Sequence, residues 1–419
     1  MKSSLAILGG PQAVDIPKPH YVWPIITEET EAAVVKQLHT DISIYDHSGI
    51  IKEFEDRFAS LHNRKFGLLT SSGTAALHSM FVAVDVHKGD EVICPAYTFF
   101  ATVTPLLQTG ATPVLCDADP ENGNVDPDDI EKLITDKTKA VIVTHMWGRA
   151  CEMDRIKQIC EKHDILLLED CSHAHGGKYQ DIPLGAWGDM AAWSLQGQKI
   201  ITGGEGGILL TNNEDFYNRG LLLGHYNKRC RQEIDKSSEY FEYAVTGMGL
   251  KLRSHPLAVA MANQQLKHLK EWTEQKTEFA KYLIDRLGKL RGIRVPELKA
   301  GEDAAWYAFV IRFIPEELEG LSVEKFFEAL QAEGCFEADI PGSTCPLNLL
   351  PLFQRPEGLF PEYEGVFSYK EGDFPKAEKY FENAIKFPVW IRSEDFALVE
   401  AYAVAIEKIV NNYKDLLEG

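Results

Sequence analysis

The chain has 419 residues, of which 45% are hydrophobic, so it can form a full core in two or three domains, or in one large domain with a smaller companion. Its formal net charge of −20 argues against a nucleic-acid partner, because phosphate backbones require a basic face. The first apolar run, Leu5 to Leu8, is too short for a secretion signal, and no later run reaches the roughly 20 apolar residues of a membrane span. We therefore expect a cytoplasmic protein with no membrane partner.

Cysteine and histidine spacing gives no sign of a metal centre. The eight cysteines occur singly, without a CxxC pair, and the thirteen histidines contain no HExxH motif. We expect reduced thiols, no disulfide framework and no metal site.

The first elements along the chain are two predicted helices, over residues 28–38 and 50–61, followed by a predicted strand at Phe66–Thr70. A polar turn, Ser71-Ser72-Gly73-Thr74, then leads into apolar residues at helical spacing. A strand, a small polar turn and a helix start can together bind an anion, because free backbone N–H groups and the helix dipole point at the turn. An ordinary helix N-cap is the alternative.

Short apolar runs alternate with helical patterns as far as residue 211. The predicted strands are 91–96, 113–116, 139–144, 165–168, 190–195 and 207–211, and the predicted helices are 102–108, 126–134 and 153–163. Continuous apolar strands separated by helices indicate an α/β fold with a mainly parallel sheet that is covered on both faces. Ligands of such sheets bind at the carboxyl ends of the strands.

The pattern changes after residue 256. A long helical run reaches about residue 290, followed by a strand at 306–313, a helix at 323–332, a loop region at 341–375 and a closing helix at 395–413. We expect a large domain over residues 1–270, which includes the N-terminal segment, and a smaller C-terminal α+β domain over residues 271–419.

Three residues suggest a specific chemistry. Lys199 lies between an apolar run and a glycine-rich turn, where a desolvated lysine loses its proton and can form a Schiff base; a surface lysine is the alternative. Asp170 ends a buried strand, where a carboxylate needs a cation such as a pyridinium N–H. Phe99 offers a flat face for a ring, although core packing is the commoner fate of phenylalanine. With the anion-binding turn, these residues describe a site for pyridoxal phosphate.

The sequence resembles the DegT/DnrJ/StrS family of sugar and cyclitol aminotransferases over nearly its whole length. The resemblance is carried by LAILGG, SSGTAALH, GDEVICPAYTFFAT, HMWGRACEMD, LLLEDCSHAHGG, GDMAAWSLQGQKIITGGEGGILLTN and FPVW. It implies the fold of aspartate aminotransferase, fold type I of the pyridoxal-phosphate enzymes, with a mainly parallel seven-stranded sheet flanked by helices and a smaller C-terminal domain.

The resemblance also implies a role for each matching residue. Lys199 would hold pyridoxal 5'-phosphate as a Schiff base, Asp170 would pair with the ring nitrogen, and Phe99 would stack on the ring. His173 would touch the ring hydroxyl. The phosphate would bind to Gly73, Thr74 and Ser194.

Two departures from the family pattern are informative. His173 stands where the family usually has Gln, and Gln196 stands where many members have His. This combination is similar to the branch that acts on cyclitols or free keto-sugars, such as scyllo-inosose aminotransferases and amino-hydroxybenzoate synthases. Lys251 replaces an Asn that reaches the phosphate of the neighbouring subunit, which implies a homodimer with a shared active site; a solvated lysine is the alternative.

The resemblance implies transfer of an amino group from glutamate or glutamine to a keto-sugar or keto-cyclitol, in the biosynthesis of amino sugars, aminocyclitols or polysaccharides. Arg229 or Arg253 could hold the donor carboxylate, although either can be structural. The alternatives are a dehydratase or amino-hydroxybenzoate synthase of the same family and a non-catalytic regulator. Loops 40–48, 225–245 and 341–375 are expected to form the pocket walls.

Overall fold

The computed structural model describes residues 4–418, and its central feature is a seven-stranded sheet in the order β1-β10-β9-β6-β5-β2-β4. β10 runs antiparallel to both of its neighbours, and the remaining pairs are parallel. The strands are β1 (Phe66–Thr70), β2 (Glu91–Pro95), β4 (Thr112–Cys116), β5 (Thr138–Thr144), β6 (Leu166–Asp170), β9 (Met190–Ser194) and β10 (Gly207–Thr211). The predicted mainly parallel, seven-stranded α/β fold is confirmed.

Alternate residues of these strands pack into two different cores, which explains why the strands are apolar without a break. On β5, Ala140 and Ile142 belong to one core, and Val141 and Val143 belong to the other. The first core contains α3 (Gly73–Ala83) and α6 (Glu214–Gly224), and the second contains α2 (Gly49–Leu61), α5 (Met153–His163) and α8 (Pro256–Gln265). The carboxyl ends of the parallel strands therefore form one buried edge that is reached from the α3 face.

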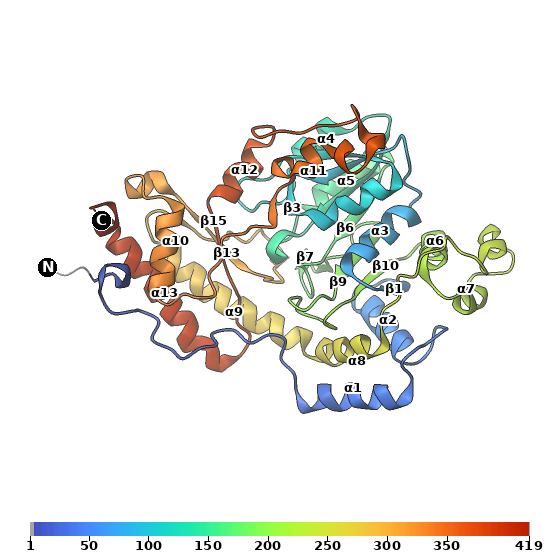
Figure 1. The fold of residues 1–419 in the computed structure, drawn as a ribbon, viewed down its shortest axis with the longest axis horizontal. Coiled ribbons are helices and arrows are strands. Elements are labelled where there is room, and N and C mark those ends of the chain that lie inside the picture. The colour runs from blue at the N-terminus through green and yellow to red at the C-terminus, as the bar shows by residue number, and fades with distance from the viewer. Residues whose placement is uncertain (1–3, 419) are drawn as a thin grey trace.

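A third core lies around a small antiparallel sheet. Its strands follow the order β11-β13-β15, and they are β11 (Ile293–Arg294), β13 (Phe309–Phe313) and β15 (Ala384–Phe387). The helices of this region are α9 (Leu269–Leu287), α10 (Val323–Ala332), α13 (Phe396–Asn411) and α14 (Tyr413–Glu418). Both ends of the described chain lie beside α10 and α13 (Figure 1). Leu5 and Val14 pack in this third core.

Residues 341–382 cross back onto the large sheet. This stretch contains β14 (Thr344–Pro346), α11 (Pro351–Gln354) and α12 (Pro375–Glu382) as well as loops, and β14 pairs with β3 (Tyr97–Phe99). Leu347 and Phe353 belong to the α3-side core. The chain thus crosses between the two regions in both directions, and the domain division at residue 270 stays a prediction.

The remaining elements border this frame. They include α1 (Glu28–Thr40), which packs along α8 (Figure 1), α4 (Pro127–Leu133) and α7 (Asn227–Glu233). The predicted helix over 102–108 consists of two short 3-10 segments, Phe100–Thr102 and Thr104–Thr109. None of the helices in the described chain combines the length and the apolar character that crossing a membrane requires. All eight cysteines are buried free thiols.

Candidate active site

A cavity of about 420 Å³ opens at the carboxyl ends of β6 and β9, beside the start of α3. This volume falls in the range of small-molecule sites, roughly 300–1,000 Å³. Most of the sequence-predicted site residues line this one cavity, namely Gly73, Thr74, Phe99, Asp170, His173, Ser194 and Lys199.

Asp170 lies at the base of the cavity as the last residue of β6, and only 3% of it is exposed. The Thr102 hydroxyl donates to Oδ2 of Asp170 at 2.7 Å, and the backbone N–H of Ser172 donates to Oδ1 at 3.0 Å. Each carboxylate oxygen of Asp170 therefore accepts one hydrogen bond, which fixes the orientation of the side chain. The site thus presents a buried, oriented carboxylate.

Lys199 follows β9 in a turn whose backbone is held from two sides. Its N–H donates to the carbonyl of Gln196 at 2.8 Å, and its own carbonyl accepts the indole N–H of Trp23 at 3.0 Å. Its Nζ lies 4.5 Å from the centre of the Tyr307 ring. Burial lowers the pKa of Lys199 to about 8; the negative charge of Asp170 opposes this shift, and the positive charge of Lys386 adds to it. The neutral amine that a Schiff base requires is therefore accessible near neutral pH.

The start of α3 forms an anion cradle with the end of β9. Ser72 caps the helix, because its hydroxyl accepts the N–H of Ala75 at 3.0 Å. A side chain at Gly73 would meet Cβ of Ser194 at 2.6 Å, so glycine is what allows the helix start and the strand end to touch. The first N–H groups of the helix have no intrahelical partner and are available to an anion. The ordinary N-cap is therefore present, and the anion site stays a prediction that this geometry permits.

Three stacked rings form one side of the cavity. The His173 ring lies 3.9 Å from the Tyr307 ring at an interplanar angle of 5°, and 5.7 Å from the Trp147 ring. Burial holds the pKa of His173 well below its usual range, and the positive charge of Lys199 lowers it further. Nδ1 of this neutral, buried ring has no hydrogen-bond partner in the described chain. Because buried polar atoms are nearly always paired, this atom fits a bound ligand group.

Phe99 closes another side of the cavity. It ends β3, and 37% of it is exposed even though the residues around it are mostly buried. Its ring does not belong to any of the three cores, so the core-packing alternative is wrong. An aromatic face left open in a cavity is suited to stacking on a planar ligand.

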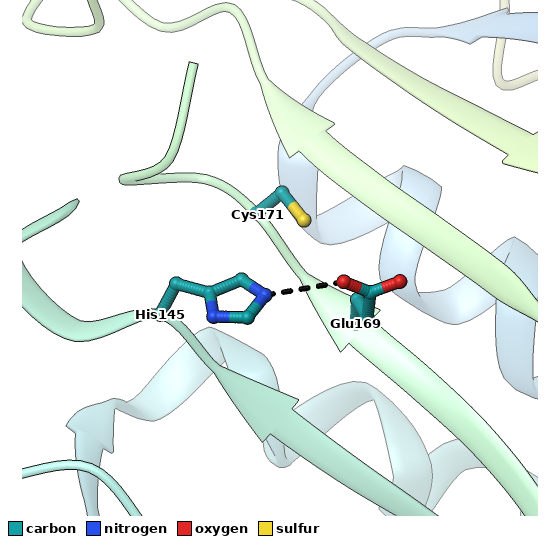
Figure 2. A group of neighbouring side chains, drawn as sticks. All are labelled: His145, Glu169 and Cys171. Atoms are coloured by element: carbon teal, nitrogen blue, oxygen red, sulfur yellow. Dashed lines mark hydrogen bonds and ion pairs between the residues drawn. The ribbon is translucent and has the colours of Figure 1, made fainter. Parts of the chain in front are cut away.

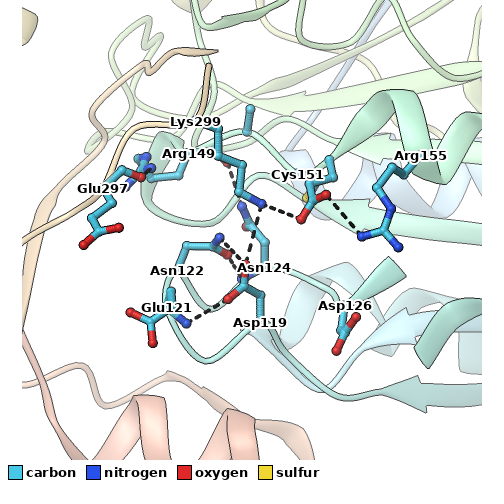
Figure 3. Close-up of polar contacts among 12 residues, drawn as sticks. Asp119, Glu121, Asn122, Asn124, Asp126, Arg149, Cys151, Arg155, Glu297 and Lys299 are labelled. Carbon is cyan, nitrogen blue, oxygen red and sulfur yellow. Dashed lines mark hydrogen bonds and ion pairs between the residues drawn. The ribbon is translucent and has the colours of Figure 1, made fainter. Parts of the chain in front are cut away.

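A polar network holds the turn that carries Trp147, and Figure 3 shows two of its members, Asn124 and Arg149. Arg149 makes a two-pronged ion pair with Glu302, with Nε–Oε1 at 2.7 Å and Nη2–Oε2 at 2.9 Å. Asn124 accepts the N–H of Met146 at 2.9 Å and donates to the carbonyl of Arg149 at 3.2 Å. The network fixes the turn that carries Trp147, whose φ of 58° is unusual for a bulky residue.

The same turn holds the neighbouring ring of Tyr307. The N–H of Ala305 donates to the carbonyl of Gly148 at 2.8 Å, and the N–H of Ala308 donates to that of Trp147 at 3.3 Å. Tyr307 lies between these two bonds, so the network fixes Trp147 and Tyr307 together.

A second network lies on the opposite face of β6 (Figure 2). Ligand atoms of His145, Glu169 and Cys171 come within 4.8 Å of one another there. The Glu169 carboxylate already accepts Nε2–H of His145 at 3.2 Å and three backbone N–H groups, from Gly185, Trp187 and Gly188, at 2.7–2.9 Å. Nδ1 of His145 accepts the N–H of Cys151 at 3.2 Å. The Glu169 carboxylate and both ring nitrogens of His145 are thus already paired, so we assign the cluster to anchoring the strand end that carries Asp170.

The remaining predicted residues lie outside the cavity. Lys251 is exposed and does not line it, so its expected contact with a partner subunit's phosphate stays a prediction. The suggestion that Arg229 binds the donor carboxylate is wrong, because Arg229 is buried and paired with Glu55 at 2.7 Å and Glu233 at 2.6 Å. Arg253 stacks on Tyr226 at 3.8 Å and does not line the cavity either.

The lining residues that sequence reasoning missed include Thr102, Trp147, Tyr307 and Lys386. Thr102 and Trp147 lie within the motifs YTFFAT and HMWGRA, just after predicted strands. That position could have indicated that they lie at the ligand-binding edge of the sheet. Tyr307 and Lys386 gave no such signal, because Tyr307 lies just before β13 and Lys386 lies on β15, both in the region of the small sheet.

Comparisons with known proteins agree with this geometry. The profile of the DegT/DnrJ/EryC1/StrS aminotransferase family matches residues 24–399. The L-glutamine:scyllo-inosose aminotransferase of Streptomyces griseus is 30% identical over 425 residues, covering 99% of this chain and 100% of that protein. The GDP-perosamine synthase of Caulobacter vibrioides is 36% identical over 236 residues, covering 54% of this chain and 61% of that protein. The crystal structure of an aminotransferase from Psychrobacter cryohalolentis superimposes with a TM-score of 0.82 at 27% identity, covering 94% and 99% of the two chains.

Proposed function

The chain belongs to the DegT/DnrJ/EryC1/StrS aminotransferase family, and on this premise we propose that it binds pyridoxal 5'-phosphate in the Lys199 cavity. There it moves an amino group from glutamine or glutamate to the carbonyl carbon of a keto-cyclitol or keto-sugar. The observation that carries the proposal is the amine of Lys199, with a pKa lowered to about 8, in one cavity with the buried carboxylate of Asp170.

The cavity residues fit this cofactor group by group. Asp170 provides the negative charge for the pyridine N–H, Phe99 provides an open ring face, and the unpaired Nδ1 of His173 fits the ring hydroxyl. The phosphate fits the start of α3, where Gly73 allows Ser194 to approach. When bound, the cofactor supplies a ring that accepts the electron pair left behind as a proton leaves the carbon next to the amino nitrogen.

Lys199 has two functions in this proposal. Its neutral amine would hold the cofactor aldehyde. Once an amino donor had displaced it, the same amine would be the base in the cavity that takes the proton from the donor carbon. Asp170 would pair with the ring nitrogen, and the hydrogen bond from Thr102 holds its carboxylate in place.

The acceptor is proposed to be an uncharged polyol ketone, and scyllo-inosose is the first to test. The full-length match to a protein named for glutamine and scyllo-inosose supports this choice over a nucleotide sugar. The charges of the cavity support it as well. Lys199 and Lys386 are the two lysines among the described lining residues, no arginine accompanies them, and Asp170, Glu205 and Asp339 supply negative charge. A diphosphate would find little compensation there.

The alternative functions lack a comparable observation. In this family the dehydratase variant replaces the lysine by histidine, and here the lysine is present and its pKa is lowered. A regulator that had lost catalysis would not require Lys199, Asp170 and the anion cradle in one cavity.

We propose a homodimer with a shared active site. Exposed apolar side chains gather just before Lys251 in the chain, namely Tyr243, Val245, Met248 and Leu250. Apolar residues that a monomer leaves in water favour a protein interface. Sedimentation equilibrium tests the dimer, and Lys251→Glu should weaken cofactor binding in the dimer without changing the cofactor-free fold.

The activity is tested by colour. Purified protein loaded with pyridoxal phosphate should be yellow, and it should bleach with L-glutamine or L-glutamate and regain its colour with scyllo-inosose. Protein that binds the cofactor but bleaches with neither donor would refute the proposed aminotransferase cycle. A panel of inososes, free keto-sugars and nucleotide keto-sugars, added to the bleached protein, identifies the acceptor.

A further inference from the structure

A second cavity, of about 480 Å³, adjoins the Lys199 cavity. The residues common to both cavities are Gln198, Tyr307, Asp339 and Lys386. Lys386 is therefore the cation in the wall that the two cavities share. Apart from Lys199, Lys386 is the one lysine or arginine among the described residues that line the first cavity.

The position of Lys386 is fixed by its backbone. It lies on β15, where its N–H donates to the carbonyl of Asp339 at 2.8 Å and its carbonyl accepts the N–H of Asp339 at 2.9 Å. The side chain continues this pairing, with Nζ 2.8 Å from Oδ2 of Asp339. The Asp339 side chain is 55% exposed and that of Lys386 is 29% exposed, so the carboxylate is the more solvated member of the pair. A pair of this kind can exchange partners at modest cost.

Lys386 is also close enough to the reacting amine to act on it. Its charge contributes to lowering the pKa of Lys199 and that of His173. Nζ of Lys386 lies 5.8 Å from the ring centre of Trp147, which lines the same cavity. A substrate whose amino group reaches Lys199 can therefore bring an adjoining charge to Lys386.

The two substrates of the proposed reaction differ in charge at this place. An amino-acid donor carries a carboxylate on the carbon that bears its amino group, whereas a polyol ketone carries hydroxyls there. The donor requires a cation next to the reaction centre, and the acceptor requires that no unpaired cation remain. We infer that Lys386 binds the α-carboxylate of the amino donor and returns to Asp339 when the uncharged acceptor occupies the same space. This inference rests on the proposed function and names the residue that distinguishes its two substrates.

The inference replaces the arginines that the sequence suggested. Arg229 is committed to Glu55 and Glu233, and Arg253 stacks on Tyr226 outside the cavity. Lys386 makes a single exchangeable ion pair at the cavity wall.

Lys386→Gln tests the inference, with Lys386→Arg as the conservative rescue and Lys162→Gln, at an exposed lysine of α5, as the control. Bleaching of the yellow protein by L-glutamine should require about 10- to 100-fold more donor in Lys386→Gln, and Lys386→Arg should restore much of the affinity. The dissociation constant of 2-methyl-L-glutamine, which has no hydrogen to lose at the reacting carbon, should rise by the same factor. This second measurement reports binding without turnover.

Two further measurements separate carboxylate binding from general damage. 4-Aminobutanamide, which is glutamine without its α-carboxylate, should bleach wild type and Lys386→Gln equally. Colour return with scyllo-inosose should also be nearly unchanged in Lys386→Gln. Asp339→Asn removes the competing carboxylate and should tighten L-glutamine binding by a few-fold.

Opposite results overturn the inference. If Lys386→Gln keeps its affinity for L-glutamine but loses colour return with scyllo-inosose, the lysine serves the acceptor. Equal losses with glutamine and 4-aminobutanamide would indicate a role unrelated to the carboxylate. A wild type that binds cofactor but bleaches with no amino donor would overturn the proposed function and this inference together.

Discussion

The two walls of the active cavity are built in different ways. The cofactor wall consists of element ends: Asp170 ends β6, Ser194 ends β9, and Gly73 begins α3. The substrate wall consists of Tyr307, Asp339 and Lys386, which come from the region of the small antiparallel sheet. Strand pairing within the one large sheet positions the first set, whereas the second set depends on how two regions of the chain pack together. In the proposed reaction the cofactor would thus be held by ends of the large sheet and its first helix, and the choice of substrate would depend on the packing of the second region.

Each wall has its own buried anchor. Glu169 ties the end of β6 to residues 185–188, and Glu302 ties Arg149 and the Trp147 turn to the strand region before Tyr307. Because the anchors are separate, a substitution at Glu169 or at Glu302 should disturb one wall and leave the other intact.

The largest expected effect is the loss of Lys199. Lys199→Ala should reduce transamination by about a thousandfold or more, because the group that holds the cofactor and moves the proton is gone. The circular dichroism spectrum and the melting temperature should stay near those of wild type, because the residue borders a cavity and not a core. Transamination at near-wild-type rates in this variant would contradict the role given to the lysine.

Breaking the two anchors should separate the two walls. Glu169→Ala and Glu302→Ala each leave a buried partner uncompensated, and each should lower the free energy of unfolding by about 3–5 kcal/mol, measured by urea titration. Glu169→Ala should weaken cofactor binding by disturbing Asp170. Glu302→Ala should mainly raise the KM values for donor and acceptor by disturbing Trp147 and Tyr307.

Asp154→Ala is the matched control for both anchors. It removes a carboxylate that, among the described residues, accepts hydrogen bonds near the surface from Tyr179 at 3.2 Å and Gln180 at 3.0 Å. It should cost about 1 kcal/mol and leave cofactor and substrate binding unchanged. Equal damage to cofactor binding from both anchor variants would contradict the separation of the walls.

The pH dependence of cofactor binding should show whether Lys386, on the substrate wall, influences the pKa of Lys199. Burial lowers the pKa of Lys199 from 10.5 to about 8, so below pH 8 the folded amine is mostly protonated. The rate at which cofactor-free protein turns yellow should rise about tenfold per pH unit below 8 and level off above it. The same shift makes stability rise with pH between about 8 and 10.5, because there the unfolded chain binds a proton that the folded chain does not.

Charge variants give the sign of this pH dependence. Lys386→Gln removes a positive neighbour and should move the midpoint to higher pH, whereas Asp170→Asn removes a negative neighbour and should move it to lower pH. Rapid-mixing measurements between pH 6 and 10 would reveal both shifts. If the midpoint in Lys386→Gln equals that of wild type, the charge of Lys386 does not influence the pKa of Lys199.

The smallest expected effect belongs to Phe99. Phe99→Ala should raise the dissociation constant for pyridoxal phosphate about three- to tenfold, because stacking contributes on the order of 1 kcal/mol. The melting temperature should hardly change, because the ring is already 37% exposed. Phe54→Ala, at a fully buried ring of α2, is the contrasting variant and should cost about 3–5 kcal/mol of stability. A large loss of stability in Phe99→Ala would contradict this prediction and indicate that the ring packs as part of the core.

The sequence by itself determined the sheet and the cofactor wall. Unbroken apolar strands require a covered sheet, and residues that follow such strands must meet at its carboxyl edge, so Asp170 and Lys199 could be placed together without coordinates. Ser194 was added by the family resemblance. Motif residues such as Gly73 and Phe99 follow from the same local order of strand, turn and helix.

Only the tertiary structure decided the substrate wall. Tyr307 and Lys386 reach the cavity because β13 and β15 pack beside the large sheet, and no local pattern encodes a contact between segments more than a hundred residues apart. For the same reason Arg229 could not be excluded in advance: its partner Glu55 lies 174 residues away in the chain. Backbone hydrogen bonding repeats along the sequence and can be read from it, whereas side-chain pairing across the fold depends on packing that a single sequence does not display.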